Sequence, residues 1–399
     1  MLFEILIAVI IGIFLGCFTG LTPGIHINLV SLLILSSSPF LLKFTSPLIL
    51  SILIISMAIT HTFLDAIPSV FLGAPDAEQV LSVLPGHRLL LEGKGYEAVS
   101  LLTIGSLISL ILIAALTPLM LFYVKYFYSI IQKYIGYLLI LACLVLILKE
   151  SRQKFFAFFI FILSGILGLT VFNLNLEDPL FPLLSGLFGI SGLLLSINDK
   201  VKIPYQFQIF PRIEKSLAAK AILTSVFSSG LCSFLPGLGP SQAAILGSSF
   251  TKNLGDKGYL ILNGGMNTVN MFISIIALFT IEKARNGAIV IVSKIIQTLT
   301  LQNLIIFVAV SLVASGLASI LTLFFAKKFS KLISKINYRL LCLSIILLIV
   351  ILSFVFSGFL GFFVLVISTS VGLIPALKGF GRNHLMGCLL LPVILYFML

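Results

Sequence analysis

Long apolar stretches separated by short polar ones run the whole length of the chain. Stretches of about 17–25 apolar residues are long enough to cross a bilayer core as α-helices. In the first half they predict membrane helices near 2–20, 46–72, 99–124, 134–148, 155–173 and 180–197. A second series follows near 219–234, 258–280, 302–325, 339–357, 359–377 and 384–399. The predicted fold class is an all-α polytopic membrane protein with about 10–14 membrane helices or re-entrant segments.

The apolar pattern is interrupted twice by a similar short break, once in each half. Residues 20–26 read Gly-Leu-Thr-Pro-Gly-Ile-His, and residues 233–240 read Ser-Phe-Leu-Pro-Gly-Leu-Gly-Pro. Proline removes a backbone donor and glycine relaxes the helix, so each break leaves a half-helix N-terminus with free N–H groups. The apolar segments that follow, 24–42 and 237–250, have lengths that fit a full crossing as well as a re-entrant segment.

The composition places the whole chain in lipid. Of its 399 residues, 59% are hydrophobic and only 10% are charged, and the mean hydropathy is +1.22. The longest polar interval, near 198–220, is too short to bury a core of its own, which excludes a soluble domain. The first ten residues carry no basic side chain and no evident cleavage site, so the first helix is expected to span the membrane rather than act as a signal peptide.

The basic residues predict the orientation in the cell membrane. The net charge is +12, but the Lys and Arg residues are scattered through loops, which does not indicate a nucleic-acid partner. Loops at 73–98, 149–154, 198–220, 326–339 and 378–382 hold seventeen of them and are predicted to be cytoplasmic. The opposite loops hold five, namely Lys125, Lys133, Lys283, Arg285 and Lys294. The halves then run in opposite directions, which predicts inverted repeats at 1–198 and 219–399 joined by a cytoplasmic loop at 199–218.

Polar residues gather on the helix that follows the broken segment in each half. They are His61, Thr62, Asp65, Asn263, Asn267, Thr268 and Asn270. A carboxylate at membrane depth costs several kcal/mol unless it is paired or lines an aqueous cavity, so Asp65 is interpreted as functional. The alternative is that Asp65 lies at a helix end with its charge among the headgroups. Because oxygen ligands suit hard cations, this set is the candidate site for a coupling ion, Na⁺ or a proton.

The residues at the two breaks form the candidate substrate site. They are Thr22, Pro23, Gly24, His26, Asn28, Pro236, Gly237, Gly239, Ser241 and Gln242. Broken helices at matching positions of two halves are typical of a transporter site at the bilayer midplane. Two helix N-termini, with a protonated His26, favour an anion with separated negative groups, such as a di- or tricarboxylate. Plain helix capping is the alternative role for these side chains.

Other chemistry is not indicated. The five cysteines lie in apolar surroundings without metal-ligand spacing or a disulfide framework, and His87 and His384 are expected in loops, in water or among headgroups. No motif of an intramembrane enzyme or an ATP-driven pump is present, and no cofactor is expected beyond the coupling ion. The predicted function is therefore a secondary transporter. A flippase for a polyisoprenyl phosphate stays open as the alternative, since helix N-termini would serve a phosphate equally well.

A series of short stretches resembles the large membrane subunit of tripartite tricarboxylate transporters, the TctA family, and more closely its shorter archaeal members. These stretches are residues 20–24, 67–76, 84–87, 93–98, 235–240 and 263–268, in that order. The resemblance implies a carrier that imports tricarboxylates or other organic acids on a cation gradient. It also implies two partners, a small membrane subunit and an extracytoplasmic binding protein. The oligomeric state is left open, with a homodimer as one option.

Overall fold

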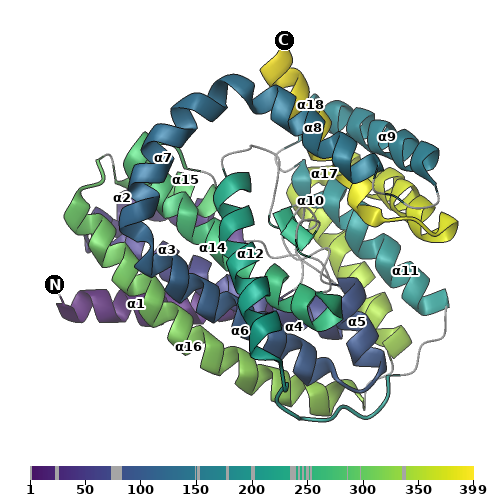
Figure 1. The fold of residues 1–399 in the computed structure, drawn as a ribbon, viewed down its shortest axis with the longest axis horizontal. Helices are drawn as coiled ribbons and strands as arrows, with labels where there is room; N and C mark the ends of the chain where they lie inside the picture. The colour runs from purple at the N-terminus through teal and green to yellow at the C-terminus, as the bar shows by residue number, and fades with distance from the viewer. Residues whose placement is uncertain are drawn as a thin grey trace.

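The protein is built from α-helices, as the apolar pattern predicts (Figure 1). The computed structural model describes residues 2–22, 27–72, 83–148, 150, 153–176, 179–198, 203–233, 240, 243–244, 247–248, 251, 254–284, 286–296, 298–334 and 338–399. Within these residues there is no strand, and seven helices are long and apolar enough to cross a membrane. Four shorter apolar helices accompany them. The predicted class, an all-α polytopic membrane protein, is confirmed.

Long and short helices are mixed along the chain. Those of the first half are α1 (Leu2–Leu21), α2 (Ile27–Leu41), α3 (Pro47–Leu64), α4 (Ala66–Phe71), α5 (Val83–Leu91), α6 (Gly95–Ala115), α7 (Thr117–Ile131), η2 (Gln132–Tyr134), α8 (Ile135–Leu148), α9 (Lys154–Phe172), α10 (Leu180–Leu184), the π-helical η3 (Ser185–Ile190) and α11 (Ser191–Asn198). Those of the second half are α12 (Lys215–Cys232), α14 (Gly255–Ile281), α15 (Gly287–Ile295), α16 (Leu301–Ile333), α17 (Tyr338–Lys378), η4 (Arg382–Met386) and α18 (Gly387–Met398).

Most predicted membrane helices lie where the apolar stretches placed them. Helix α17 contains a sharp bend at Gly358, where φ is 62° and ψ is −161°, so it forms two arms that match the separate helices predicted at 339–357 and 359–377. The single helix predicted over 99–124 is wrong, because the chain breaks at Leu116 between α6 and α7. Pro118 explains the break, since it cannot donate within a helix but fits the first turn of a new one.

Two segments expected to be loops contain short helices, α5 and α15. Helix α15 is only nine residues long, too short to span a membrane. A helix cap and buried side chains hold it in place. Its start is capped by Asn286, whose Oδ1 accepts a hydrogen bond from the Ala288 N–H at 2.9 Å. Most of its apolar side chains are buried, namely Ala288, Ile289, Ile291, Val292 and Ile295.

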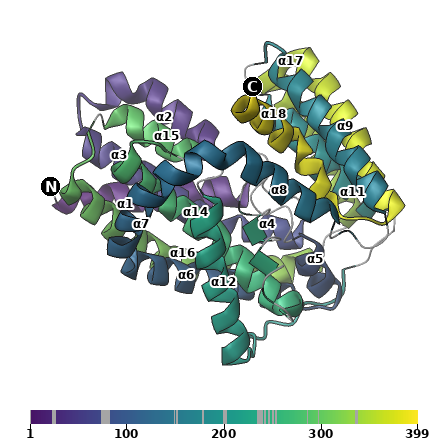
Figure 2. The same ribbon diagram turned by 45° about the horizontal axis from the view of Figure 1, so that its top comes forward.

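The two halves of the chain contribute to both of two helical bundles (Figure 2). The first bundle takes the early helices of each half, with α1 packed on α3, α12 on α14, α16 on α3 and α6 on α14. The second bundle takes the late helices, with α9 packed on α18 and α17 on α10, η3 and α11. Helix α7 leads from the first bundle to the second.

Glycines allow the central helices of the first bundle to approach closely. A Cβ atom at Gly16 of α1 would lie 2.6 Å from the Met57 carbonyl oxygen of α3. On α14, a Cβ at Gly264 would lie 2.2 Å from the Leu102 carbonyl oxygen of α6. Small residues at such crossings allow backbone packing where lipid supplies no hydrophobic driving force. The spans containing α3 and α14 are each 78% buried, against 33% for α1, so these two helices form the centre of the bundle.

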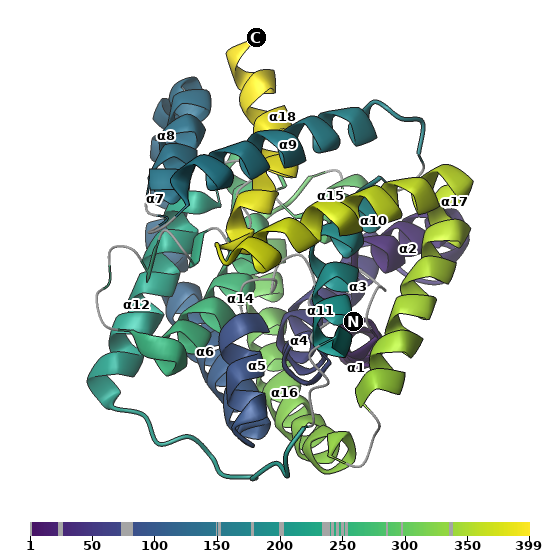
Figure 3. The ribbon, with the colours of Figure 1, turned by 90° about the vertical axis from the view of Figure 1, so that its right-hand side faces the viewer.

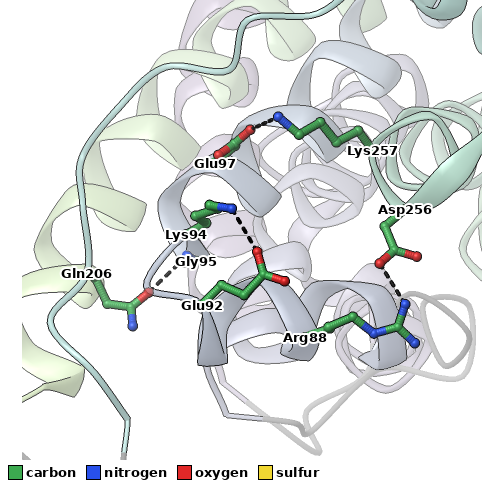
Figure 4. Close-up of polar contacts among 8 residues, drawn as sticks. All are labelled: Arg88, Glu92, Lys94, Gly95, Glu97, Gln206, Asp256 and Lys257. Atoms are coloured by element: carbon green, nitrogen blue, oxygen red, sulfur yellow. Dashed lines mark hydrogen bonds and ion pairs between the residues drawn. The ribbon is translucent and has the colours of Figure 1, made fainter.

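Within each bundle, hydrogen bonds join loops that charge assigned to the cytoplasm. In the first bundle the Gly95 N–H donates to Oε1 of Gln206 at 2.9 Å, which joins 73–98 to 198–220 (Figure 4). Two ion pairs tie the same end to the start of α14, Arg88 with Asp256 at 2.7 Å and Glu97 with Lys257 at 2.5 Å. Nε2 of Gln208 donates to the Lys327 carbonyl oxygen at 3.0 Å, which joins the loops at 198–220 and 326–339. In the second bundle Nε2 of Gln153 donates to the Lys378 carbonyl oxygen at 2.8 Å, which joins 149–154 to 378–382. Each bundle thus gathers predicted cytoplasmic loops at one end.

The Arg88–Asp256 and Glu97–Lys257 ion pairs are expected to differ in strength. The Glu97 side chain is only 11% exposed, whereas Arg88 is 64% exposed. We expect Glu97→Gln to lower the free energy of unfolding by about 1–2 kcal/mol and Arg88→Gln by less than about 1 kcal/mol, since exposed pairs are screened by water and salt. Thermal unfolding at low and high salt measures both. Equal losses in the two variants would contradict this ranking.

Candidate functional site

The centre of the first bundle holds a buried polar contact between the two halves. Asp65 lies between α3 and α4 and is 2% exposed. Nδ2 of Asn267, on α14, donates a hydrogen bond to Oδ2 of Asp65 at 2.8 Å. A side chain among lipid headgroups would be exposed, so the structure does not support that alternative for Asp65. The carboxylate belongs to the interface of α3 and α14.

A second polar contact lies beside the first. The hydroxyls of Thr62 and Thr268 are 3.2 Å apart, and both side chains are buried. Thr62 precedes Asp65 by about one helical turn, so both face α14. Oδ1 of Asn267 makes no hydrogen bond to any residue that the structure describes. Buried acceptors without a partner are uncommon in proteins, which makes this oxygen a candidate ligand atom.

Two of the remaining polar candidates contact α1 and the end of α12. Nδ1 of His61 lies 3.0 Å from the Thr19 hydroxyl of α1. Oδ1 of Asn270 accepts a hydrogen bond from Ser233, directly after α12, at 2.9 Å. Asn263 is fully buried on α14. Of the seven candidates, four thus form two direct contacts between the halves, Asp65 with Asn267 and Thr62 with Thr268.

The ends of α1 and α12, where the two breaks begin, flank this polar centre. A Cβ at Gly20, near the end of α1, would lie 3.2 Å from the Asp65 nitrogen. The end of α12 reaches the centre through Ser233 and Asn270, three residues beyond Asn267. Both breaks therefore start next to the same pair of helices.

Two candidate substrate residues fall within the described chain. The Thr22 N–H donates to the Phe18 carbonyl oxygen at 3.1 Å and completes the last turn of α1. The Asn28 side chain lies against Gly287 at the start of α15, where an added Cβ would be 2.4 Å from its Oδ1. The other candidates lie outside the described residues, namely Pro23, Gly24, His26, Pro236, Gly237, Gly239, Ser241 and Gln242.

Several hydroxyl side chains that support α14 were not predicted. The Ser106 hydroxyl of α6 donates to the Gly264 carbonyl oxygen at 2.9 Å, and the hydroxyls of Ser109 and Ser225 are 2.8 Å apart. The three-residue spacing of Ser106 and Ser109 on α6 was an available signal, since small polar residues mark helix contacts in membranes. The first bond holds α14, which carries Asn267, and the second joins α6 to α12 next to Gly265 of α14.

The expectation of solvated loop histidines is wrong. His384 lies in η4 and is 2% exposed, with its Nε2 3.1 Å from Oε2 of Glu150. Its carbonyl oxygen accepts from the Ser164 hydroxyl of α9, so η4 is packed within the second bundle. His87 lies in α5 and is half-buried; burial lowers its pKa below the ordinary value, although a backbone hydrogen bond with Val70 opposes the shift. A largely uncharged imidazole at neutral pH follows.

Together, these features define a polytopic helical membrane protein whose buried polar contact between α3 and α14 is flanked by the ends of α1 and α12. The model of the Tripartite tricarboxylate transporter TctA family matches residues 6–387, and the chain belongs to this family. It is thus a transporter and not an enzyme, and the resemblance found in the sequence is confirmed. Uncharacterized protein MJ1079 of Methanocaldococcus jannaschii is 31% identical over 395 residues, 95% of either chain. No solved structure matches the chain.

Proposed function

We propose that this chain is the membrane carrier for a di- or tricarboxylate, driven by a sodium or proton gradient. The observation that carries the proposal is the buried contact of Asp65 with Asn267, which joins the two halves beside both breaks. Family membership supports the tricarboxylate class and, through the tripartite name, a small membrane subunit and an extracytoplasmic binding protein as partners. It also favours this function over a polyisoprenyl-phosphate flippase.

The buried carboxylate is the proposed point of coupling. A cation or proton bound at Asp65 would remove most of the cost of holding its negative charge away from water. The free energy of the α3–α14 interface would then depend on occupancy of that site. Gly20 and Ser233 join the ends of α1 and α12 to the same interface. The affinity for a substrate bound at the breaks would therefore depend on whether the ion is bound.

The equivalent packing of helices supports two inverted repeats at 1–198 and 219–399. Helix α1 packs on α3 as α12 packs on α14, and α16 packs on α3 as α6 packs on α14. In the second bundle, α18 packs on α9 as α11 packs on α17. Such correspondence is expected when two similar units are related by an axis in the membrane plane. Under this proposal the substrate lies on that axis, between the breaks.

Ligand-dependent unfolding of the purified protein tests the function. We expect a di- or tricarboxylate at a hundred times its Kd to stabilise the folded state by about 2.7 kcal/mol. The gain should require the coupling ion and should vanish with a monocarboxylate of similar size. Stabilisation by a polyisoprenyl phosphate and by no carboxylate would overturn the proposal in favour of a flippase.

A further inference from the structure

The segment that connects the two halves buries a polar side chain and exposes several apolar ones. Residues 203–214, here called the linker strap, run extended between α11 and α12 at the end of the first bundle that charge assigns to the cytoplasm (Figure 3). The polar Gln206 is 2% exposed. Four apolar side chains in the middle of the strap point outward instead: Tyr205 is 72% exposed, Phe207 53%, Ile209 64% and Phe210 53%. Contiguous exposed apolar side chains of this kind mark an interaction surface.

Hydrogen bonds hold the strap in one register. Oε1 of Gln206 accepts from the Gly95 N–H at 2.9 Å (Figure 4). Nε2 of Gln206 donates to the Leu90 carbonyl oxygen at 2.9 Å. The Phe207 N–H donates to the carbonyl oxygen of Gly93 at 2.8 Å. Because side chains alternate along an extended chain, burying Gln206 directs its two neighbours outward. The rings of Tyr205 and Phe207 then pack edge to face, with centroids 5.6 Å apart.

The strap contacts α16 near the turn at which the exposed side chains of α16 change from apolar to basic. Nε2 of Gln208 donates to the Ser330 hydroxyl at 3.1 Å. Above that turn the exposed stripe of α16 is apolar, with Ile320 67% and Phe324 52% exposed. Below it three lysines are exposed, Lys327, Lys328 and Lys331, together with one apolar side chain, Leu332. Helix α12 shows the same change, from exposed Phe227 and Leu223 to exposed Lys220.

Lipid-facing stripes that end in lysine mark the level of the lipid headgroups, because the long side chains reach polar groups there. The strap is continuous with two such stripes and carries aromatic side chains at the same level. Aromatic rings concentrate at this boundary, and clustered lysines attract anionic headgroups. Continuity with the lipid-facing stripes favours a lipid surface over a protein from the cytosol.

We propose that the linker strap lies in the headgroup layer of the cytoplasmic leaflet and binds anionic lipids. The rings of Tyr205, Phe207 and Phe210 occupy the boundary between headgroups and acyl chains. Lys327, Lys328 and Lys331 bind lipid phosphates beside them. The strap thereby anchors the first bundle to the membrane surface at the junction of the two halves. This role is independent of the transported substrate.

A single tryptophan tests the location, because the chain has none of its own. Phe207→Trp is reconstituted as the full-length protein in vesicles of phosphatidylcholine and phosphatidylglycerol, with Tyr205→Trp as a second reporter should the first fail to fold. We expect blue-shifted emission, protection from acrylamide, and quenching by brominated lipid. Phe14→Trp on the exposed face of α1 calibrates quenching by lipid. Ready acrylamide quenching of both strap reporters, without quenching by lipid, would overturn the proposal and leave the strap as a surface for a soluble partner.

The preference for anionic lipid is measured with the same reporter. In mixed vesicles, brominated phosphatidylglycerol is expected to quench Phe207→Trp about twofold more than brominated phosphatidylcholine at equal content. Adding Lys327→Gln, Lys328→Gln and Lys331→Gln should bring that ratio close to one. Lys43→Gln, an exposed lysine between α2 and α3, should leave the ratio unchanged. Equal quenching by the two lipids in the reporter that retains its lysines would refute the anionic part of the proposal.

Discussion

Replacing Asp65 by asparagine is expected to lower gradient-driven uptake at least about 100-fold, comparable to the loss of a few kcal/mol of ion-binding free energy. The substitution keeps the size of the side chain and a hydrogen bond to Asn267 but removes the charge that a cation or proton would neutralise. The folded protein should therefore persist, with unchanged gel filtration and little change in Tm. Uptake by reconstituted vesicles under a sodium or proton gradient measures the effect.

Two further variants separate charge from position. Asp256→Asn removes a carboxylate from a largely exposed ion pair, so uptake should stay near normal. The double variant Asp65→Asn, Asn267→Asp keeps one carboxylate and one amide at the same contact, and we expect it to regain part of the uptake. Concentrative uptake by Asp65→Asn at the normal rate would exclude Asp65 from coupling.

Adding one methyl group at Gly264 is expected to be among the most damaging small changes in the first bundle. A Cβ there would lie 2.2 Å from the Leu102 carbonyl oxygen and 2.8 Å from the Leu102 Cα, so α6 and α14 must move apart. Overpacking of this kind costs about 1–3 kcal/mol. Because α14 also carries Asn267, Gly264→Ala should reduce both Tm and uptake. Thermal unfolding and the vesicle assay measure the two losses.

Gly316→Ala on α16 is the matched control. Nothing lies within 4 Å of a Cβ added at Gly316, and its backbone is helical, so alanine should be neutral or slightly stabilising. If Gly316→Ala lowered Tm and uptake as much as Gly264→Ala, the effect would come from replacing any helix glycine. The close approach of α6 and α14 would then not explain it.

The sequence predicts the membrane helices well because apolar length and bilayer thickness determine them. Gly358, for example, falls between two apolar stretches and divides α17 as expected. Helices α5 and α15 were missed because nine residues are too few to register as a span. Helix neighbours are harder to predict, because lipid-facing and protein-facing apolar side chains are chemically alike. The glycines of α1 at positions 12, 16 and 20 were the clearest available sign of its packing on α3.

The candidate ion site was recognisable from the cost of polar groups at membrane depth, and the Asp65–Asn267 contact now joins two members of the predicted set. The partners of His61 and Asn270 were not recognisable. Thr19 and Ser233 are hydroxyl residues at helix ends, where such side chains commonly bond their own backbone. Thr19 does so with the Gly16 carbonyl oxygen at 3.2 Å while also meeting His61, and only the rotation of α1 against α3 decides this second contact.

The wide separation of Asp65 from its partner has a consequence for biosynthesis. Asn267 lies 202 residues further along the chain, so α3 is made long before α14. At about 5–20 residues per second, about 10–40 s pass before the two can meet. During that interval an aspartate within a span opposes insertion, by up to the roughly 2.5–3.5 kcal/mol found at a helix centre, which favours keeping α3 near the translocon or the aqueous interface. A fragment that stops before α14 would leave α3 in this state permanently, and we expect quality-control proteases to remove it.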